Sequence, residues 1–135
     1  MKKVCIVGST GSIGTQTLNV IRRDPEAFDV VCLIAGGNVS LFSRQISEFH
    51  PKFVGMASKE ACATLCAEGF SAKTGDALYA LIPECDADIY VIAVSGIAGL
   101  KFALAAAKTG KRVALANKES MVAAGALFKR YTLKL

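Results

Sequence analysis

The stretch VCIVGSTGSIG, residues 4–14, joins a short apolar run to a loop with a glycine at every third position. The run at residues 4–7 consists mostly of β-branched side chains and is typical of a strand buried on both faces. After the loop, Leu18 and Ile21 continue a helical apolar pattern that stops before Pro25. The stretch therefore predicts a strand, a tight turn and a helix.

The rest of the chain repeats this alternation. Apolar runs predict further strands, at residues 28–35, 53–56, 70–73, 88–94 and 111–116. The segments between them predict helices, at residues 40–49 with Ser40 as N-cap, 58–69 with Ser58 as N-cap, 76–82, 96–109 and 121–131. Strands separated by helices form βαβ units, whose right-handed crossovers build a parallel sheet covered on both faces. We therefore expect residues 1–135 to form a single α/β domain with a doubly wound, mostly parallel sheet.

Composition and charge narrow the class of protein. Hydrophobic residues make up 53% of the chain and charged residues 20%, which excludes a disordered chain. The net charge of +5 favours anionic ligands, but no aromatic stacking pattern accompanies it, so we expect no nucleic-acid partner. Apolar runs such as residues 89–94 and 102–107, which no other run exceeds in length, are far shorter than the roughly 20 residues of a membrane-spanning helix. We expect a cytoplasmic protein without a membrane partner.

The five cysteines predict no metal site. They include no CxxC pair, and His50 is the only histidine in the sequence, so a structural zinc site is not expected. We expect small, buried or half-buried thiols in a reducing compartment.

The glycine loop suits a phosphate group. Gly8 permits a tight exit from the strand, Gly11 lets the main chain approach a ligand, and Gly14 lets the helix pack closely. The N–H groups at the start of the helix would face a pyrophosphate. Three hydroxyls lie nearby: those of Ser9, Thr10 and Ser12. A plain glycine turn is the alternative, and the missing GK[ST] sequence disfavours a nucleoside triphosphatase loop.

The loop after the second predicted strand reads AGGN, residues 35–38. A dinucleotide fold for NAD usually carries Asp or Glu there, and such a carboxylate would repel a 2′-phosphate. The amides of Gly36 and Gly37 and the side chain of Asn38 tolerate that phosphate, so NADP is preferred over NAD. Arg44 lies in the following helix. A glycine turn that only joins strand to helix is the alternative.

Two more loops follow strands whose carboxyl ends meet at the same edge, VSG at 94–96 and LANKES at 115–120. We expect both to flank the nicotinamide half of a dinucleotide. Lys118 could bind a substrate phosphate or carboxylate, and Glu119 could accept hydrogen bonds from a ribose. Capping of the next helix is the alternative, with Asn117 or Ser120 as the cap and Glu119 complementing the helix dipole.

Together, GSTGSIG, AGGN, VSG and LANKES resemble one family closely, the 1-deoxy-D-xylulose 5-phosphate reductoisomerases. The family comprises NADPH-dependent oxidoreductases of the non-mevalonate pathway of isoprenoid biosynthesis. The resemblance runs from Lys3 to about Arg130 and implies a Rossmann-like NADPH-binding domain. It also implies a homodimer and a sugar phosphate substrate, which the family isomerises and reduces to 2-C-methyl-D-erythritol 4-phosphate.

The resemblance assigns roles to matching residues. Four match the region that binds the NADPH pyrophosphate: Thr10, Gly11, Ser12 and Ile13. Three match the adenosine 2′-phosphate end: Gly36, Gly37 and Asn38. Asn117 and Glu119 match NADPH contacts, and Lys118 matches a contact to the sugar phosphate. The family often has Lys or Arg where Gly37 stands, so backbone amides or nearby basic side chains must substitute here.

The resemblance also implies what this chain lacks. Family members continue into a catalytic domain, with acidic ligands for Mg²⁺ or Mn²⁺, and a C-terminal domain. We therefore expect cofactor binding without turnover, and neither catalytic nor metal-binding residues in residues 1–135. A non-catalytic NADP-sensing module is the alternative. Two other oxidoreductase classes do not fit, because His50 is remote from the strand-end cysteines and no tyrosine has a lysine four residues on.

Overall fold

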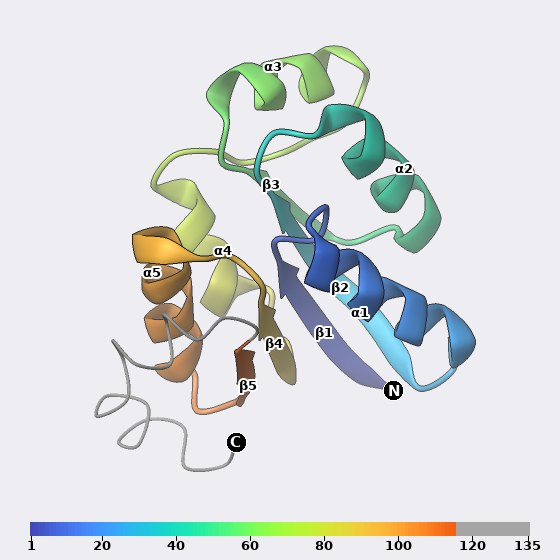
Figure 1. The fold of residues 1–135 in the computed structure, drawn as a ribbon, viewed down its shortest axis with the longest axis vertical. Helices are drawn as coiled ribbons and strands as arrows, with labels where there is room; N and C mark the ends of the chain where they lie inside the picture. Colours follow the sequence, from blue (N-terminus) through green and yellow to red (C-terminus); the bar gives the residue numbers. More distant parts are fainter. Residues whose placement is uncertain (116–135) are drawn as a thin grey trace.

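A computed structural model describes residues 1–115 and shows a five-stranded sheet between two layers of helices (Figure 1). The strands are β1 (Lys2–Val7), β2 (Phe28–Ala35), β3 (Phe53–Met56), β4 (Ile89–Ile92) and β5 (Arg112–Leu115). The helices are α1 (Ser12–Arg23), α2 (Val39–Phe49), α3 (Lys59–Ala67), α4 (Ala77–Glu84) and α5 (Gly96–Ala107). All neighbouring strands are parallel. The expected α/β class and doubly wound parallel sheet are confirmed.

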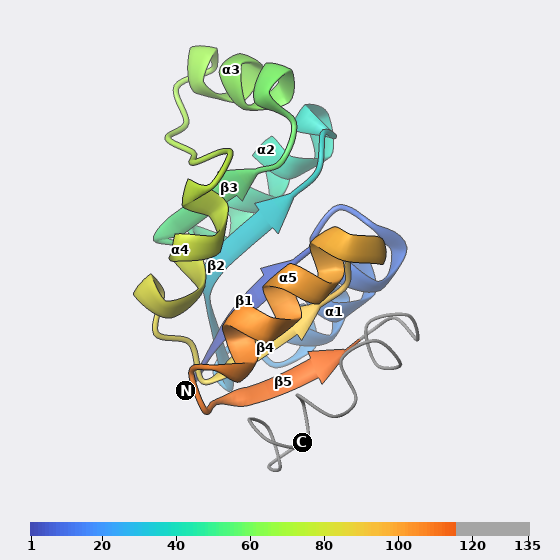
Figure 2. The same ribbon diagram turned by 90° about the vertical axis from the view of Figure 1, so that its left-hand side faces the viewer.

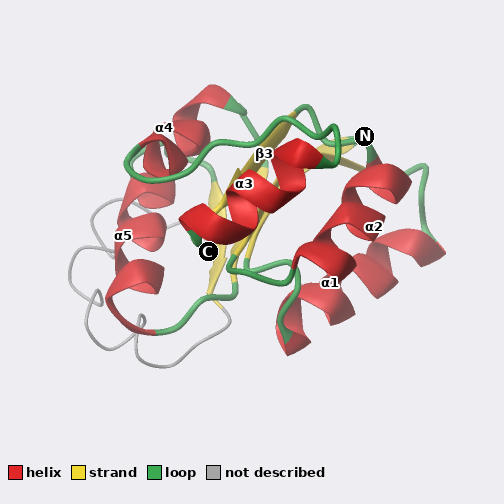
Figure 3. Ribbon diagram, turned by 90° about the horizontal axis from the view of Figure 1, so that it is seen from above, coloured by secondary structure: helices red, strands yellow, loops and turns green. Residues whose placement is uncertain are grey.

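The strand order is β3-β2-β1-β4-β5. The chain moves outward from β1 to β3 and then returns to the other side of β1, so the order reverses between β1 and β4. Figure 3 looks at the sheet from above and shows α1 and α2 on one side and α4 and α5 on the other. In sheets of this kind, ligands bind at the carboxyl ends of the strands where the order reverses. We call the carboxyl ends of β1 and β4 the switch point.

Each central strand supplies side chains to both faces of the sheet. In β1, Val4 and Ile6 pack with residues of α1, α2 and α3, whereas Cys5 and Val7 pack with residues of α4 and α5. All four side chains are at most 2% exposed. Figure 2 shows α4 and α5 lying across the second face. Burial on both faces explains why the strand is apolar at consecutive positions and not only at alternate ones.

The second helix begins earlier than the sequence predicts. The N-cap of α2 is Asn38, whose Oδ1 accepts a hydrogen bond from the Leu41 N–H at 3.1 Å. The prediction of Ser40 as the cap is therefore wrong. Two glycines complete the turn after β2 and bring Asn38 into the cap position two residues sooner. Ser58 is confirmed as the cap of α3, because its Oγ accepts a hydrogen bond from the first turn of that helix.

The predicted strand at residues 70–73 does not form. Within this segment, Lys73 makes an isolated parallel bridge with Gly55 of β3. Its N–H and its carbonyl bond to the residues on either side of Gly55, each at 2.9 Å. The chain then turns at Gly75, whose φ is +67°. The prediction was wrong because the turn carries the chain away from the sheet edge after one pairing.

The other boundaries agree with the sequence prediction to within a few residues. The predicted loop at 117–120 and the predicted helix at 121–131 lie outside the described residues. Within residues 1–115, no helix is both long enough and apolar enough to cross a membrane.

Replacing Tyr90 by Phe should weaken the core. Tyr90 is fully buried, and its hydroxyl donates to the Ile82 carbonyl at 2.6 Å. Loss of this bond should lower the free energy of unfolding by about 1 kcal/mol, measured by urea denaturation. In the control Tyr79→Phe the side chain is partly exposed and its ring contact with Phe102 is kept, so the change should stay within about 0.5 kcal/mol. Equal losses in the two variants would contradict the assignment.

Candidate functional site

The glycine loop, residues 8–11, is held against the ends of three strands. Gly8 has a φ of +91°, and a Cβ added there would lie 2.7 Å from the carbonyl oxygen of Ala93, just after β4. The N–H groups of Gly8 and Ser9 both donate to the Ile34 carbonyl of β2, at 2.7 and 3.2 Å. The loop therefore lies where β1, β2 and β4 end, and position 8 requires glycine.

The start of α1 rests directly on this loop. A Cβ at Gly14 would lie 2.0 Å from the Gly8 carbonyl oxygen, so the close approach predicted for Gly14 is confirmed. Gly11 differs, because a Cβ there would meet the Gly8 carbonyl oxygen at 3.6 Å, an ordinary contact. Gly11 is exposed, and the protein's own packing does not require glycine there. Its missing side chain leaves the start of α1 open on the outer side.

The helices at the switch point lack capping side chains. The cap of α1 is Gly11, and the cap of α5 is Ser95, whose side chain makes no capping hydrogen bond. Neither first turn contains an acidic residue. By contrast, Asn38 and Ser58 cap α2 and α3, and Asp76 places an acidic side chain at the cap of α4. The positive end of α1, which has neither a capping side chain nor an acidic residue, is therefore suited to an external anion.

A buried glutamine of α2 fixes the glycine loop from behind. Gln45 is 3% exposed, and its Nε2 donates to the Ser9 carbonyl at 2.9 Å. Ser9 is wholly buried, and its Oγ finds no hydrogen-bond partner within residues 1–115. The expectation that the Ser9 hydroxyl is available to a ligand is therefore wrong, since this side chain is turned into the interior. Gln45 was not predicted from the sequence, although a polar residue one turn after the core residue Phe42 was a usable signal.

The AGGN loop lies beside the start of α3. The Ser58 N–H donates to the Gly36 carbonyl at 3.0 Å, and a Cβ on Gly37 would lie 3.6 Å from the Ser58 Cβ. Lys59 follows as the first residue of α3 and is exposed. A cation there opposes the helix dipole, so its position gives α3 no stability. This proximity was not predicted from the sequence, which offered Arg44 as a nearby cation. Arg44 instead lines a depression with Ser47 and Glu68.

The structure brings together two of the predicted groups. Thr10, Gly11, Ser12 and Ile13 form the start of α1, and Gly36, Gly37 and Asn38 follow the adjacent strand β2. The VSG loop lies against the glycine loop, since an added Cβ at Gly8 would lie 3.0 Å from the Val94 side chain. Asn117, Lys118 and Glu119 lie outside the described residues. The Oδ1 atom of Asn38 caps α2, so only the side-chain amino group of Asn38 remains to donate a hydrogen bond to a ligand.

Carboxylates with a shifted pKa lie at the other end of the sheet within residues 1–115. The Arg22 guanidinium donates to Glu48 at 2.6 and 2.7 Å and lowers the pKa of that carboxyl group. The Lys3 N–H donates to Asp88 at 2.9 Å and lowers its pKa in the same way. Both pairs lie near the carboxyl ends of helices or the start of β1. The described part of the switch point therefore offers anion-binding groups, and no carboxylate with a shifted pKa lies in that part.

Comparison with known proteins gives one consistent match. A family model described as 1-deoxy-D-xylulose 5-phosphate reductoisomerase matches residues 4–125. The protein of that name from Thermoanaerobacter sp. (strain X514) is 48% identical over 128 residues, and the one from Proteus mirabilis (strain HI4320) is 42% identical over 135. These alignments cover 93% and 95% of this chain and 34% of each relative. The chain thus spans about a third of the length of the curated relatives it matches.

Solved structures give the same result. A crystal structure of DOX-P reductoisomerase in complex with NADPH, fosmidomycin and magnesium matches with a TM-score of 0.89 and 35% identity. That match covers 99% of this chain and 34% of the other. The Zymomonas mobilis 1-deoxy-D-xylulose 5-phosphate reductoisomerase in complex with NADPH matches with a TM-score of 0.83 and 34% identity, over 96% of this chain and 35% of the other.

Replacing Gly14 by Ala should disrupt the loop and the helix together. The added methyl group would collide with the main chain at the Gly8 carbonyl, which no side-chain rotation can relieve. We expect a loss of about 2 kcal/mol or more of unfolding free energy, measured by urea denaturation. Gly36→Ala is the matched control, because no atom lies within 4 Å of an added Cβ there. Equal stability of the two variants would contradict the described packing.

Proposed function

The chain belongs to the 1-deoxy-D-xylulose 5-phosphate reductoisomerase family, and from this we propose that it forms the NADPH-binding part of such an enzyme. The observation that carries the proposal is the start of α1, where Gly11 leaves the first-turn N–H groups without a capping side chain at the switch point. Such a helix start is an anion site. Two of the matching crystal structures are complexes with NADPH, which supports the choice of ligand.

The pyrophosphate would bind at the glycine loop. The main-chain N–H groups of Ser12 and Ile13 donate to its oxygens, with the Thr10 hydroxyl beside them. The positive end of α1 stabilises its charge, and no acidic side chain in the first turn opposes it. Two apolar side chains at the starts of α1 and α5 offer surface to the cofactor's rings, since Ile13 is 42% exposed and Ile97 is 75% exposed.

The adenosine 2′-phosphate would bind at the AGGN loop. Gly36 and Gly37 offer main-chain amides, and Asn38 offers its amino group. The family often has Lys or Arg at position 37, and we propose that Lys59 supplies the positive charge here. Lys59 is exposed and follows Ser58, whose Cβ would lie 3.6 Å from a Cβ on Gly37. A cation at this place distinguishes NADPH from NADH, because only NADPH carries the extra phosphate.

The reaction proposed for the complete enzyme is that of the family. NADPH, when bound, supplies a hydride to the substrate. The substrate is the sugar phosphate 1-deoxy-D-xylulose 5-phosphate, and the product is 2-C-methyl-D-erythritol 4-phosphate. Asn117 and Glu119 keep their predicted role at the nicotinamide half, and Lys118 keeps its predicted role at the sugar phosphate. The homodimer and the cytoplasmic location also stay predictions.

The divalent cation of the family does not fit the described residues. Mg²⁺ and Mn²⁺ take oxygen ligands, including carboxylates. Within residues 1–115, the metal-ligating side chains that come together as a group of three are the thiols of Cys5, Cys32 and Cys85. Thiols do not suit Mg²⁺ or Mn²⁺. We therefore assign cofactor binding to this part of the chain and no step to a metal ion.

An assay of NADPH oxidation separates this proposal from an NADP-sensing module. The chain should bind NADPH without oxidising it in the presence of 1-deoxy-D-xylulose 5-phosphate and Mg²⁺. Joined to the C-terminal two thirds of a matching reductoisomerase, it should support turnover. Binding without turnover in the joined protein would favour the sensing module.

Replacing Gly11 by Asp should weaken NADPH binding more than tenfold. The carboxylate would stand at the open start of α1 and repel the pyrophosphate. Gly11→Ala is the control, because its Cβ makes an ordinary 3.6 Å contact and adds no charge. Calorimetric titration with NADPH measures all three proteins, and an unchanged affinity of the Asp variant would refute the site.

Replacing Lys59 by Gln should weaken NADPH binding about tenfold, the value of one charge-assisted hydrogen bond to phosphate, and leave NADH binding unchanged. Lys101→Gln is the control, since Lys101 lies near Tyr79 between α4 and α5, on the other face of the sheet. The readout is the ratio of the two dissociation constants. A parallel loss of NADH affinity would show that Lys59 acts on the fold and not on the phosphate.

A further inference from the structure

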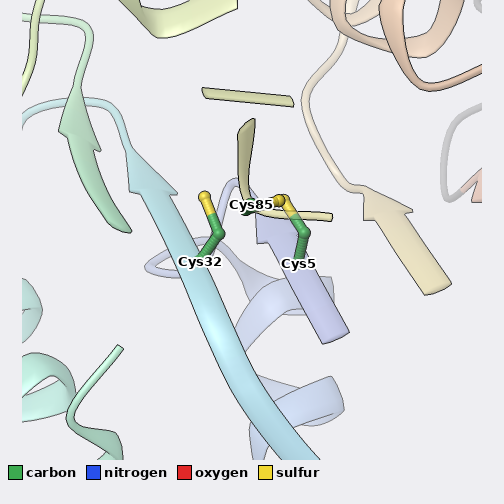
Figure 4. A group of neighbouring side chains, drawn as sticks. All are labelled: Cys5, Cys32 and Cys85. Atoms are coloured by element: carbon green, nitrogen blue, oxygen red, sulfur yellow. The ribbon is translucent and has the colours of Figure 1, made fainter. Parts of the chain in front are cut away.

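Three cysteine side chains meet in the core, away from the switch point. Cys5 of β1, Cys32 of β2 and Cys85 at the end of α4 place their Sγ atoms within 4.8 Å of one another (Figure 4). Cys5 and Cys32 are fully buried, and Cys85 is 4% exposed. We call these residues the thiol trio.

The fold brings the thiol trio together by register and by a helix end. Cys5 and Cys32 are direct partners across the β1–β2 pairing and belong to the same packed face. Cys85 is the C-cap residue of α4, which lies on that face. The surroundings are apolar, with side chains such as Leu81 and Ile82, and the Tyr90 hydroxyl lies 3.9 Å from the Cys85 Sγ. Three soft ligands thus lie close together in an apolar part of the core.

The charge of a bound ion decides which ions fit. Within residues 1–115, the buried polar side chains are the uncharged Ser9 and Gln45, so no buried cation balances a thiolate. Three thiolates around Cu(I) or Zn²⁺ leave a net negative charge, which is costly in an apolar interior. Three thiolates around a trivalent ion leave a neutral complex. Trivalent ions that prefer sulfur ligands are therefore the class of ion that these three thiols would bind at the lowest cost in buried charge.

We propose that Cys5, Cys32 and Cys85 form a binding site for trivalent arsenic, taken up as arsenous acid. Each thiol replaces one hydroxyl group, so three As–O bonds break and three As–S bonds form. The three thiol protons leave with the three hydroxyl groups as water. Arsenic stays trivalent, and the step needs neither an oxidant nor a reductant. This site is independent of the nucleotide site.

Cys85 is the entry point. It is the least buried of the three, and it follows the exposed residues Pro83 and Glu84 at the end of a short helix. The order of bond formation therefore runs from the helix end inward.

A second pair of thiols must be removed before the site is tested. Cys62 and Cys66 lie four residues apart on α3, one buried and one exposed, and two thiols at that spacing can also hold arsenic. Such a two-thiol complex keeps one hydroxyl group on arsenic. The double variant C62S/C66S is therefore the starting protein for the experiment.

The test is native mass spectrometry of C62S/C66S titrated with arsenite under a phosphine reductant. We expect one bound arsenic with the loss of three protons, and a raised thermal midpoint, because the ion links three elements of the native fold. Adding C85S, or C85A as the second replacement, should abolish the three-proton mass shift and the rise in midpoint. No binding by C62S/C66S, a mass that retains a hydroxyl group, or an unchanged thermal midpoint would each overturn the proposal.

Discussion

A Cβ at position 14 would lie 2.0 Å from the Gly8 carbonyl oxygen, so α1 can rest on the glycine loop only because residue 14 is glycine. This contact fixes the direction in which α1 leaves the sheet. The loop is held from the other sides as well, by the Ile34 carbonyl of β2 and by Gln45 of α2. Main-chain groups at the start of α1 are therefore fixed before any ligand arrives, which lowers the entropy that binding must remove.

Helix capping differs between the centre of the sheet and its β3 edge. Asn38 and Ser58 satisfy the first turns of α2 and α3 with their own side chains, and a cap of this kind contributes about 1 kcal/mol. The helices that follow β1 and β4 receive no such side-chain bond, with Gly11 and Ser95 at their caps. The molecule thus forgoes a side-chain cap where the strand order reverses, and at α1 we propose that an anion takes its place.

The two faces of the sheet serve different purposes. Residues of α1, α2 and α3 form the face that shapes the proposed cofactor site, through Gln45 behind the glycine loop and Lys59 beside the AGGN loop. Residues of α4 and α5 cover the opposite face, which holds the thiol trio and Tyr90. The thiols belong to this chain's own core packing, and nothing in the proposed cofactor chemistry uses them.

The sequence by itself determined the order of elements and the glycine loop, because strand and helix periodicity and glycine spacing are properties of neighbouring residues. It also indicated the family through four short motifs. Contacts between residues distant in the sequence could not be predicted from it: Gln45 with Ser9, the start of α3 at Ser58 beside the AGGN loop, and the meeting of three cysteines that had looked like scattered core residues. These depend on the strand order β3-β2-β1-β4-β5 and on the face to which each side chain points. Tertiary structure decided them because packing, and not local propensity, sets which strands become neighbours.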